Sequence, residues 1–95
     1  MAEGSGVGGK SMKQVATDVA DGYTTINPLI LKKFDKDMLK GLYEHLNKAM
    51  NSVRNQPVAF HDVSAMRMKN MKLQRLHNAL IVVRNHAREK RVALT

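Results

Sequence analysis

The chain has 95 residues, 43% of them hydrophobic, and its 16 lysines and arginines against 8 aspartates and glutamates give a net charge of +8 at pH 7. This length suits one modest domain, and the lack of cysteine excludes a disulfide framework, an iron–sulfur cluster and a cysteine nucleophile. No apolar run approaches the roughly 20 residues that cross a bilayer. We expect a protein that does not enter membranes and that works in the cytoplasm or inside a host cell.

A glycine-rich segment at residues 1–10 matches a phosphate-binding motif. Gly4 to Ser11 read G-x-x-x-x-G-K-S, the loop that cradles phosphates in nucleotide triphosphatases. That loop requires a buried strand before it, but only three residues precede Gly4. We therefore interpret residues 1–10 as a disordered tail and residues 11–95 as a single small helical domain, and we expect no cofactor.

A short helix is predicted from Met12 to about Ala20. Apolar side chains recur at helical spacing, Ser11 is suited to cap the start, and Asp21-Gly22 is a stop signal. Residues 14–26 resemble the helix-turn-helix pattern, which would offer a route to DNA binding. Pro28 would interrupt the second helix of that motif, so we favour instead a brief separate helix that starts at Asn27-Pro28.

The clearest helical pattern covers residues 36–54. Leucines at 39, 42 and 46 are followed by Ala49 and Val53, which gives alternating steps of three and four residues. Asp35 is a natural N-cap, and Glu44 with Lys48 forms a stabilising pair one helical turn apart. We predict a helix here, ended by the connector around Pro57, in which residues 58–60 are expected to fold back onto the core.

A second long helix is predicted over residues 63–92, antiparallel to the first because the connector is short. Its middle, Ala79 to Val83, is apolar in every direction around the helix. One alternative is a strand at residues 80–83, which are rich in β-branched side chains. The heptad rhythm through this segment favours the helix. A two-helix hairpin covers only one side of such a girdle, so we expect N-terminal helices, self-association, or both, to complete an all-α fold.

The positive charge is concentrated in residues 57–95, which hold half of the basic residues and only two acidic ones. A localised positive field attracts polyanions such as nucleic acid. Around the helix these cations spread widely instead of forming one stripe, which indicates phosphate contacts without a reading face. The candidate nucleic-acid-binding residues are Arg67, Lys69, Lys72, Arg75, Arg84, Arg88, Lys90 and Arg91.

Apolar residues of the same helix that point away from the expected seam are candidates for a protein interface. Methionine-rich surfaces adapt to partner helices. The candidate residues for self-association or for a partner helix are Met68, Met71, Ile81 and Val82.

No pattern indicates catalysis. The four histidines lack the spacing of helical metal ligands, and the acidic residues fall mainly at helix starts, where capping explains them. We expect a protein without enzymatic activity and without a metal site. The leading hypothesis is a small basic protein that contacts nucleic-acid phosphates through its C-terminal helix and could serve in regulation. The alternative is a helical assembly or adaptor protein, such as a viral, secretion or regulatory component, that acts through contacts with other chains.

Overall fold

The structure, a computed structural model, describes residues 11–94, and these residues form four helices without a strand. The chain runs through α1 (Met12–Asp21), α2 (Pro28–Leu31), α3 (Lys36–Arg54) and α4 (Val63–Glu89). The all-α class and the hairpin with short N-terminal helices are thus confirmed. The predicted tail and the phosphate-loop motif up to Lys10 lie outside the described residues.

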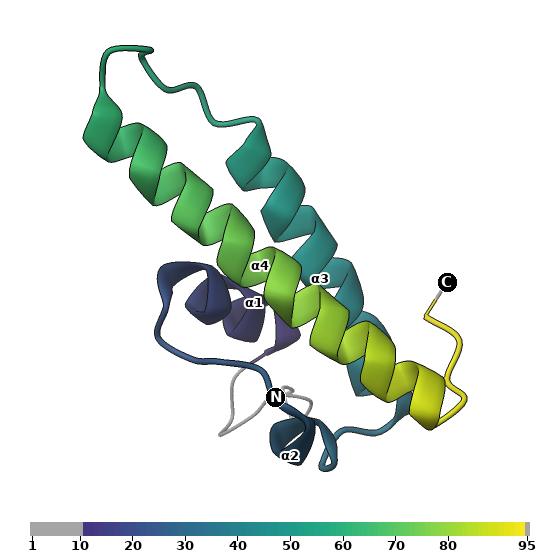
Figure 1. The fold of residues 1–95 in the computed structure, drawn as a ribbon. Coiled ribbons are helices and arrows are strands. Elements are labelled where there is room, and N and C mark those ends of the chain that lie inside the picture. Colours follow the sequence, from purple (N-terminus) through teal and green to yellow (C-terminus); the bar gives the residue numbers. More distant parts are fainter. Residues whose placement is uncertain (1–10, 95) are drawn as a thin grey trace.

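The hairpin of α3 and α4 forms the long axis of the molecule (Figure 1). The leucine rhythm of α3 explains why it packs on α4, because Leu39, Leu42 and Leu46 share one face and are fully buried. Leu76 and Val83 of α4 meet them in the same core. The alternative strand at residues 80–83 is excluded, since these residues lie within α4.

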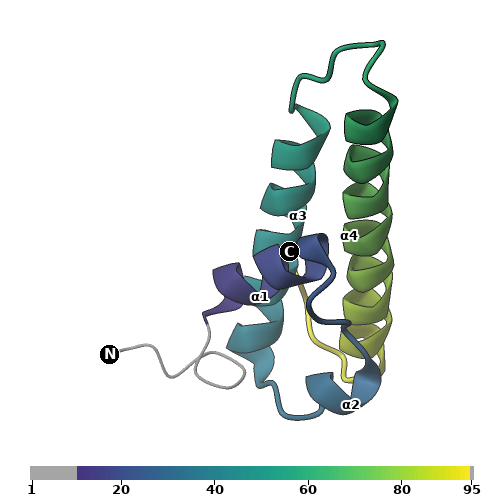
Figure 2. The ribbon, with the colours of Figure 1, turned by 90° about the vertical axis from the view of Figure 1, so that its left-hand side faces the viewer.

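The N-terminal helices cover the apolar girdle of α4. Helix α1 packs across the middle of the hairpin, and α2 lies near the end opposite the connector (Figure 2). With their help Ala79, Leu80 and Val83 are buried, Val82 is partly buried, and Ile81 stays 39% exposed. The chain itself therefore meets most of the need for cover that suggested self-association, which stays a prediction.

Each helix starts at a polar N-cap, as the sequence indicates. The side chain of Asp35 accepts a hydrogen bond of 2.8 Å from the amide of Met38, and Asp62 accepts one of 3.0 Å from Ala65. Ser11 and Asn27 cap α1 and α2 in the same way. These bonds satisfy amide groups that have no partner within the helix and so fix where each helix begins.

Helix α4 ends at Glu89, three residues before the predicted end. The amide of Val92 donates to the carbonyl of Ala87 at 2.8 Å, and the amide of Arg91 donates to that of Arg88 at 3.1 Å. This pattern is a Schellman cap, and it places Arg91 at a positive φ of 57°. Glycine usually holds this position, as Gly22 does at the end of α1 with a φ of 84°. Because arginine at this position is not a helix-stop signal as glycine is, the sequence pattern did not locate the end of α4.

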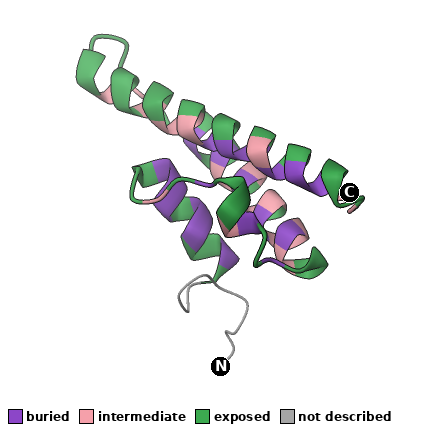
Figure 3. Ribbon diagram, turned by 60° about the horizontal axis from the view of Figure 1, so that its bottom comes forward, coloured by how far each residue is buried: buried purple, intermediate pink, exposed green. Residues whose placement is uncertain are grey.

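The connector does not fold back onto the core. Phe60 is 89% exposed and stacks edge-on against His61, with ring centroids 5.5 Å apart. The connector and the first turns of α4 extend beyond α1, and they are mostly exposed (Figure 3). The prediction that residues 58–60 pack inward is wrong for Phe60, because neither α1 nor α2 reaches that end of the hairpin.

Candidate nucleic-acid interface

Three of the eight predicted phosphate-binding cations point toward the rest of the chain. Lys69 donates a hydrogen bond of 2.9 Å to the carbonyl of Gln56 in the connector. The ammonium group of Lys72 lies 3.7 Å from the carboxylate of Asp21 in α1. Both lysines are partly buried. Because they are three residues apart, the two lysines are neighbours on the surface of α4. Their contacts join α4 to the connector and to α1.

The third inward cation is Arg75, which caps the end of α1. Its guanidinium donates to the carbonyl of Ala20 at 3.1 Å, across 55 positions of sequence. A side chain on Gly22 would meet this group, since a Cβ at that position would lie 2.9 Å from Cζ of Arg75. Arg75 thus supplies a charged donor to the end of a helix where carbonyls lack partners. The positive φ of 84° at Gly22 is the main reason for glycine at this position, and Arg75 would have to move to admit a side chain there.

The other five cations are exposed. Arg67, Arg84 and Arg88 project from α4, and Lys90 and Arg91 follow its last turn. At 100° per residue the three helical arginines fall within an arc of about 100° on the side opposite the core. The eight basic residues together spread around the helix, as the sequence interpretation has it, but these three share one side. The spread came from including the cations that serve internal contacts.

Amide side chains occupy the same exposed side of α4 between the arginines. Asn70, Gln74, Asn78 and Asn85 follow one another at steps of four and seven residues, and all are exposed. Together with the arginines they define the outer face of α4, an arc of about 120°. Its members are Arg67, Asn70, Gln74, His77, Asn78, Ile81, Arg84, Asn85 and Arg88. The spacing of the amides was visible in the sequence, but which side of α4 is free was not.

The charged residues of α4 are almost all basic. Glu89 is the sole acidic residue of the 27 in α4, and it lies at the last position. The outer face therefore presents hydrogen-bond donors and positive charge over the roughly 32 Å from Arg67 to Arg88. No carboxylate within it offsets attraction to a polyanion.

The four predicted protein-interface residues do not form one surface. Met68 and Met71 are exposed near the connector, Ile81 lies on the outer face, and Val82 is partly buried. Val82 instead lines a pocket with Val19 and Ile26. Exposed apolar residues also lie at the connector end of the hairpin, on more than one side of α4. We call these four residues the tip cluster: Phe60, Val63, Met66 and Met68.

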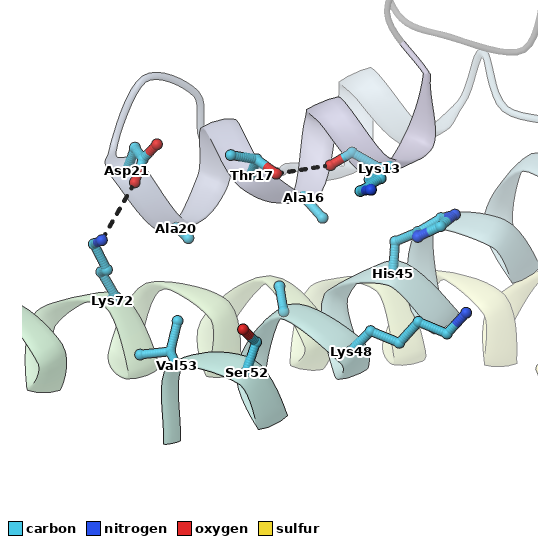
Figure 4. Close-up of a pocket in the computed structure, with 11 residues that line it drawn as sticks. Lys13, Ala16, Thr17, Ala20, Asp21, His45, Lys48, Ser52, Val53 and Lys72 are labelled. Carbon is cyan, nitrogen blue, oxygen red and sulfur yellow. Dashed lines mark hydrogen bonds and ion pairs between the residues drawn. The ribbon is translucent and has the colours of Figure 1, made fainter. Parts of the chain in front are cut away.

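A half-open groove of about 430 Å³ separates α1 from α3 (Figure 4). Its floor includes Ala16, Ala20 and Val53, and lysines stand at its rim. The hydroxyl of Thr17 donates to the carbonyl of Lys13 at 3.1 Å, within α1. Among the described residues that line this groove, no nucleophilic side chain is hydrogen-bonded to the side chain of a base.

Over residues 11–94 no cluster of three His, Asp or Glu side chains is placed to hold a metal ion. Among the same residues no helix has the length and apolar character needed to cross a membrane. Comparisons of the chain with protein-family models, with curated proteins and with solved structures found no match. The site must therefore be interpreted from its own residues.

Proposed function

We propose that this protein binds nucleic acid without enzymatic activity, through contacts between the phosphates and the exposed cations of α4 and its C-terminal end. The observation that carries the proposal is the outer face of α4, where three exposed arginines share one side with no acidic residue. Arginine forks match phosphate oxygens in two parallel hydrogen bonds. Because these guanidinium groups project into solvent, a phosphate can reach them without first displacing another element of the described chain.

The number of cations that face solvent sets how strongly nucleic-acid binding should depend on salt. Each phosphate neutralised on duplex DNA contributes about 0.9 to the slope of log affinity against log salt. Up to five contacts, from Arg67, Arg84, Arg88, Lys90 and Arg91, correspond to a slope of about −4.5. Affinity should then fall on the order of a hundredfold or more between 50 and 200 mM salt. Including Lys69, Lys72 and Arg75 would predict a steeper slope, of about −7.

A salt titration of duplex binding by fluorescence anisotropy tests the proposal. We expect detectable binding at ~50 mM salt and a slope near that of five contacts. Exchanging Arg67, Arg84 and Arg88 together for glutamine should make the slope less steep by about 2.7. A matched control exchanges the exposed α3 residues Lys36, Lys48 and Arg54 for glutamine, which removes the same charge elsewhere. Equal losses in the two variants, or no binding by the parent protein, would refute the role of α4.

The tip cluster favours a second candidate function, assembly with other chains. Phe60 and Met68 are 89% and 60% exposed, and the exposed Val63 and Met66 lie at the same end of the hairpin. Clustered exposed apolar residues are typical of protein contact sites, and methionines adapt to varied partners. Sedimentation equilibrium of the parent protein and of a Phe60→Ser, Met68→Ser variant tests this role. A parent protein that stays monomeric at all concentrations would count against self-assembly through the tip.

A further inference from the structure

The outer face of α4 has a distinct order along its length. Arginines stand toward its ends, at Arg67 and at Arg84 with Arg88, while uncharged polar and apolar side chains fill the middle. Arg67 and Arg88 are 21 positions apart, which is about 32 Å along a helix. A straight helix placed against a curved groove approaches most closely at its middle, and its ends diverge toward the rims. The ends of this face thus meet phosphates, and its middle meets whatever lies on the groove floor.

The elements packed on α4 leave most of this face open. Helices α1 and α3 pack on the opposite side of α4 (Figure 2), and α2 also contacts α4. Asn78, at the edge of the face, borders a pocket that Gly22, Thr24 and Thr25 also line. The major groove of B-form DNA, about 12 Å wide, admits an α-helix, whereas the A-form groove of duplex RNA is too narrow and deep for side chains to read. The exposed arc of α4 suits the shape of the major groove. The flanking arginines and the absence of acidic side chains before Glu89 suit the negative charge of the DNA phosphates.

From this order we infer that the nucleic acid is duplex DNA and that α4 lies in its major groove, with Gln74, Asn78 and Ile81 against the base edges. This inference rests on the proposed function. Carboxamide side chains pair with N6 and N7 of adenine through one donor and one acceptor, and an apolar side chain packs on the methyl group of thymine. Gln74, Asn78 and Ile81 are exposed at successive positions of the face. The three residues therefore select A·T pairs over G·C pairs.

The same chemistry explains an otherwise unfavourable feature. Ile81 is 39% exposed in the middle of a polar face. A thymine methyl group would bury part of that side chain on binding. Polar residues on either side, such as His77 and Asn85, leave room for hydrogen bonds to neighbouring bases or phosphates.

To test this inference, binding sites are selected from a pool of random duplex DNA. The affinities of the parent protein and of its variants are then measured on the selected site and on a scrambled duplex. We expect an enriched site containing A·T pairs. The Gln74→Ala, Asn78→Ala double variant should lose at least about fivefold on that site for each lost pair. Its affinity for the scrambled duplex and its salt slope should stay unchanged. The control Asn51→Ala removes an exposed amide from α3 and should behave as the parent protein on both duplexes.

The outcomes separate this inference from the proposed function. If no site is enriched, or if the double variant keeps its preference while scrambled DNA still binds, base reading by α4 is wrong and phosphate binding stands. An equal preference for the same sequence as duplex RNA would also overturn the inference. If the parent protein binds no duplex at all, both the inference and the proposed function fail. Circular dichroism of each variant verifies that the fold is retained.

Discussion

Exchanging Arg75 for methionine should destabilise the fold and leave nucleic-acid binding unchanged. The substitution keeps an unbranched apolar stem but removes the guanidinium that donates to the carbonyl of Ala20 at 3.1 Å. Hydrogen bonds from charged donors contribute about 1.5–3 kcal/mol to stability. Because Arg75 is only partly buried, we expect the lower end, about 1.5 kcal/mol. For a domain of this size that loss lowers the melting temperature by about 6–12 °C.

The matched variant Arg84→Met makes the same chemical change nine positions along the same helix. Arg84 is exposed, so its stability should stay within about 0.5 kcal/mol of the parent protein. Its salt slope on duplex DNA should fall by about 0.9 instead. Urea unfolding followed by circular dichroism and a salt titration of anisotropy give the two quantities. The division between inward and outward cations is refuted if Arg75→Met unfolds as the parent protein does and loses the same salt slope as Arg84→Met.

Four further predictions concern backbone geometry and helix capping, and all are measured by urea unfolding. Gly22→Ala should cost about 1–2 kcal/mol, because Gly22 has a φ of 84° and a Cβ there would press on Arg75. Gly41→Ala should instead add about 0.5–1 kcal/mol to the stability, since Gly41 lies inside helix α3 and a Cβ there would be an ordinary 3.5 Å from the side chain of Met12 in α1. Higher stability of Gly22→Ala together with lower stability of Gly41→Ala would contradict the structure. Arg91→Gly should add up to about 1 kcal/mol by relieving the positive φ, and a loss of stability would show that the α4 cap is misplaced. Asp62→Ala should cost about 1 kcal/mol through loss of the α4 N-cap, and an unchanged midpoint would argue against that bond.

The sequence predicted the helices where local signals agree. Asp35 and the leucine rhythm locate α3 to its observed bounds, and Asp62 marks the start of α4. The end of α4 escaped prediction because Arg91 adopts a conformation that glycine usually supplies. Phe60 was expected to fold back onto the core, but burial depends on a neighbouring element, and neither α1 nor α2 reaches the connector.

The candidate site was only partly predictable for a related reason. A helix projection shows where side chains point, but it does not show which side of the helix is covered. Only the placement of α1 against α4 reveals that Lys72 and Arg75 meet Asp21 and Ala20. Once these contacts are assigned, the remaining arginines fall on one side. The amides between them were overlooked because neutral polar residues carry no signal in a count of charge.

The most direct test of the proposed interface is to locate the nucleic-acid contact surface by NMR. Amide and side-chain resonances of the protein labelled with ¹⁵N are followed while a DNA duplex is added at low salt. We predict that the largest shifts fall on the outer face of α4, with the side chains of Arg67, Arg84 and Arg88 among them, while the groove between α1 and α3 is unaffected. Shifts confined to that groove or to the tip cluster, with α4 unchanged, would contradict the assignment of this face.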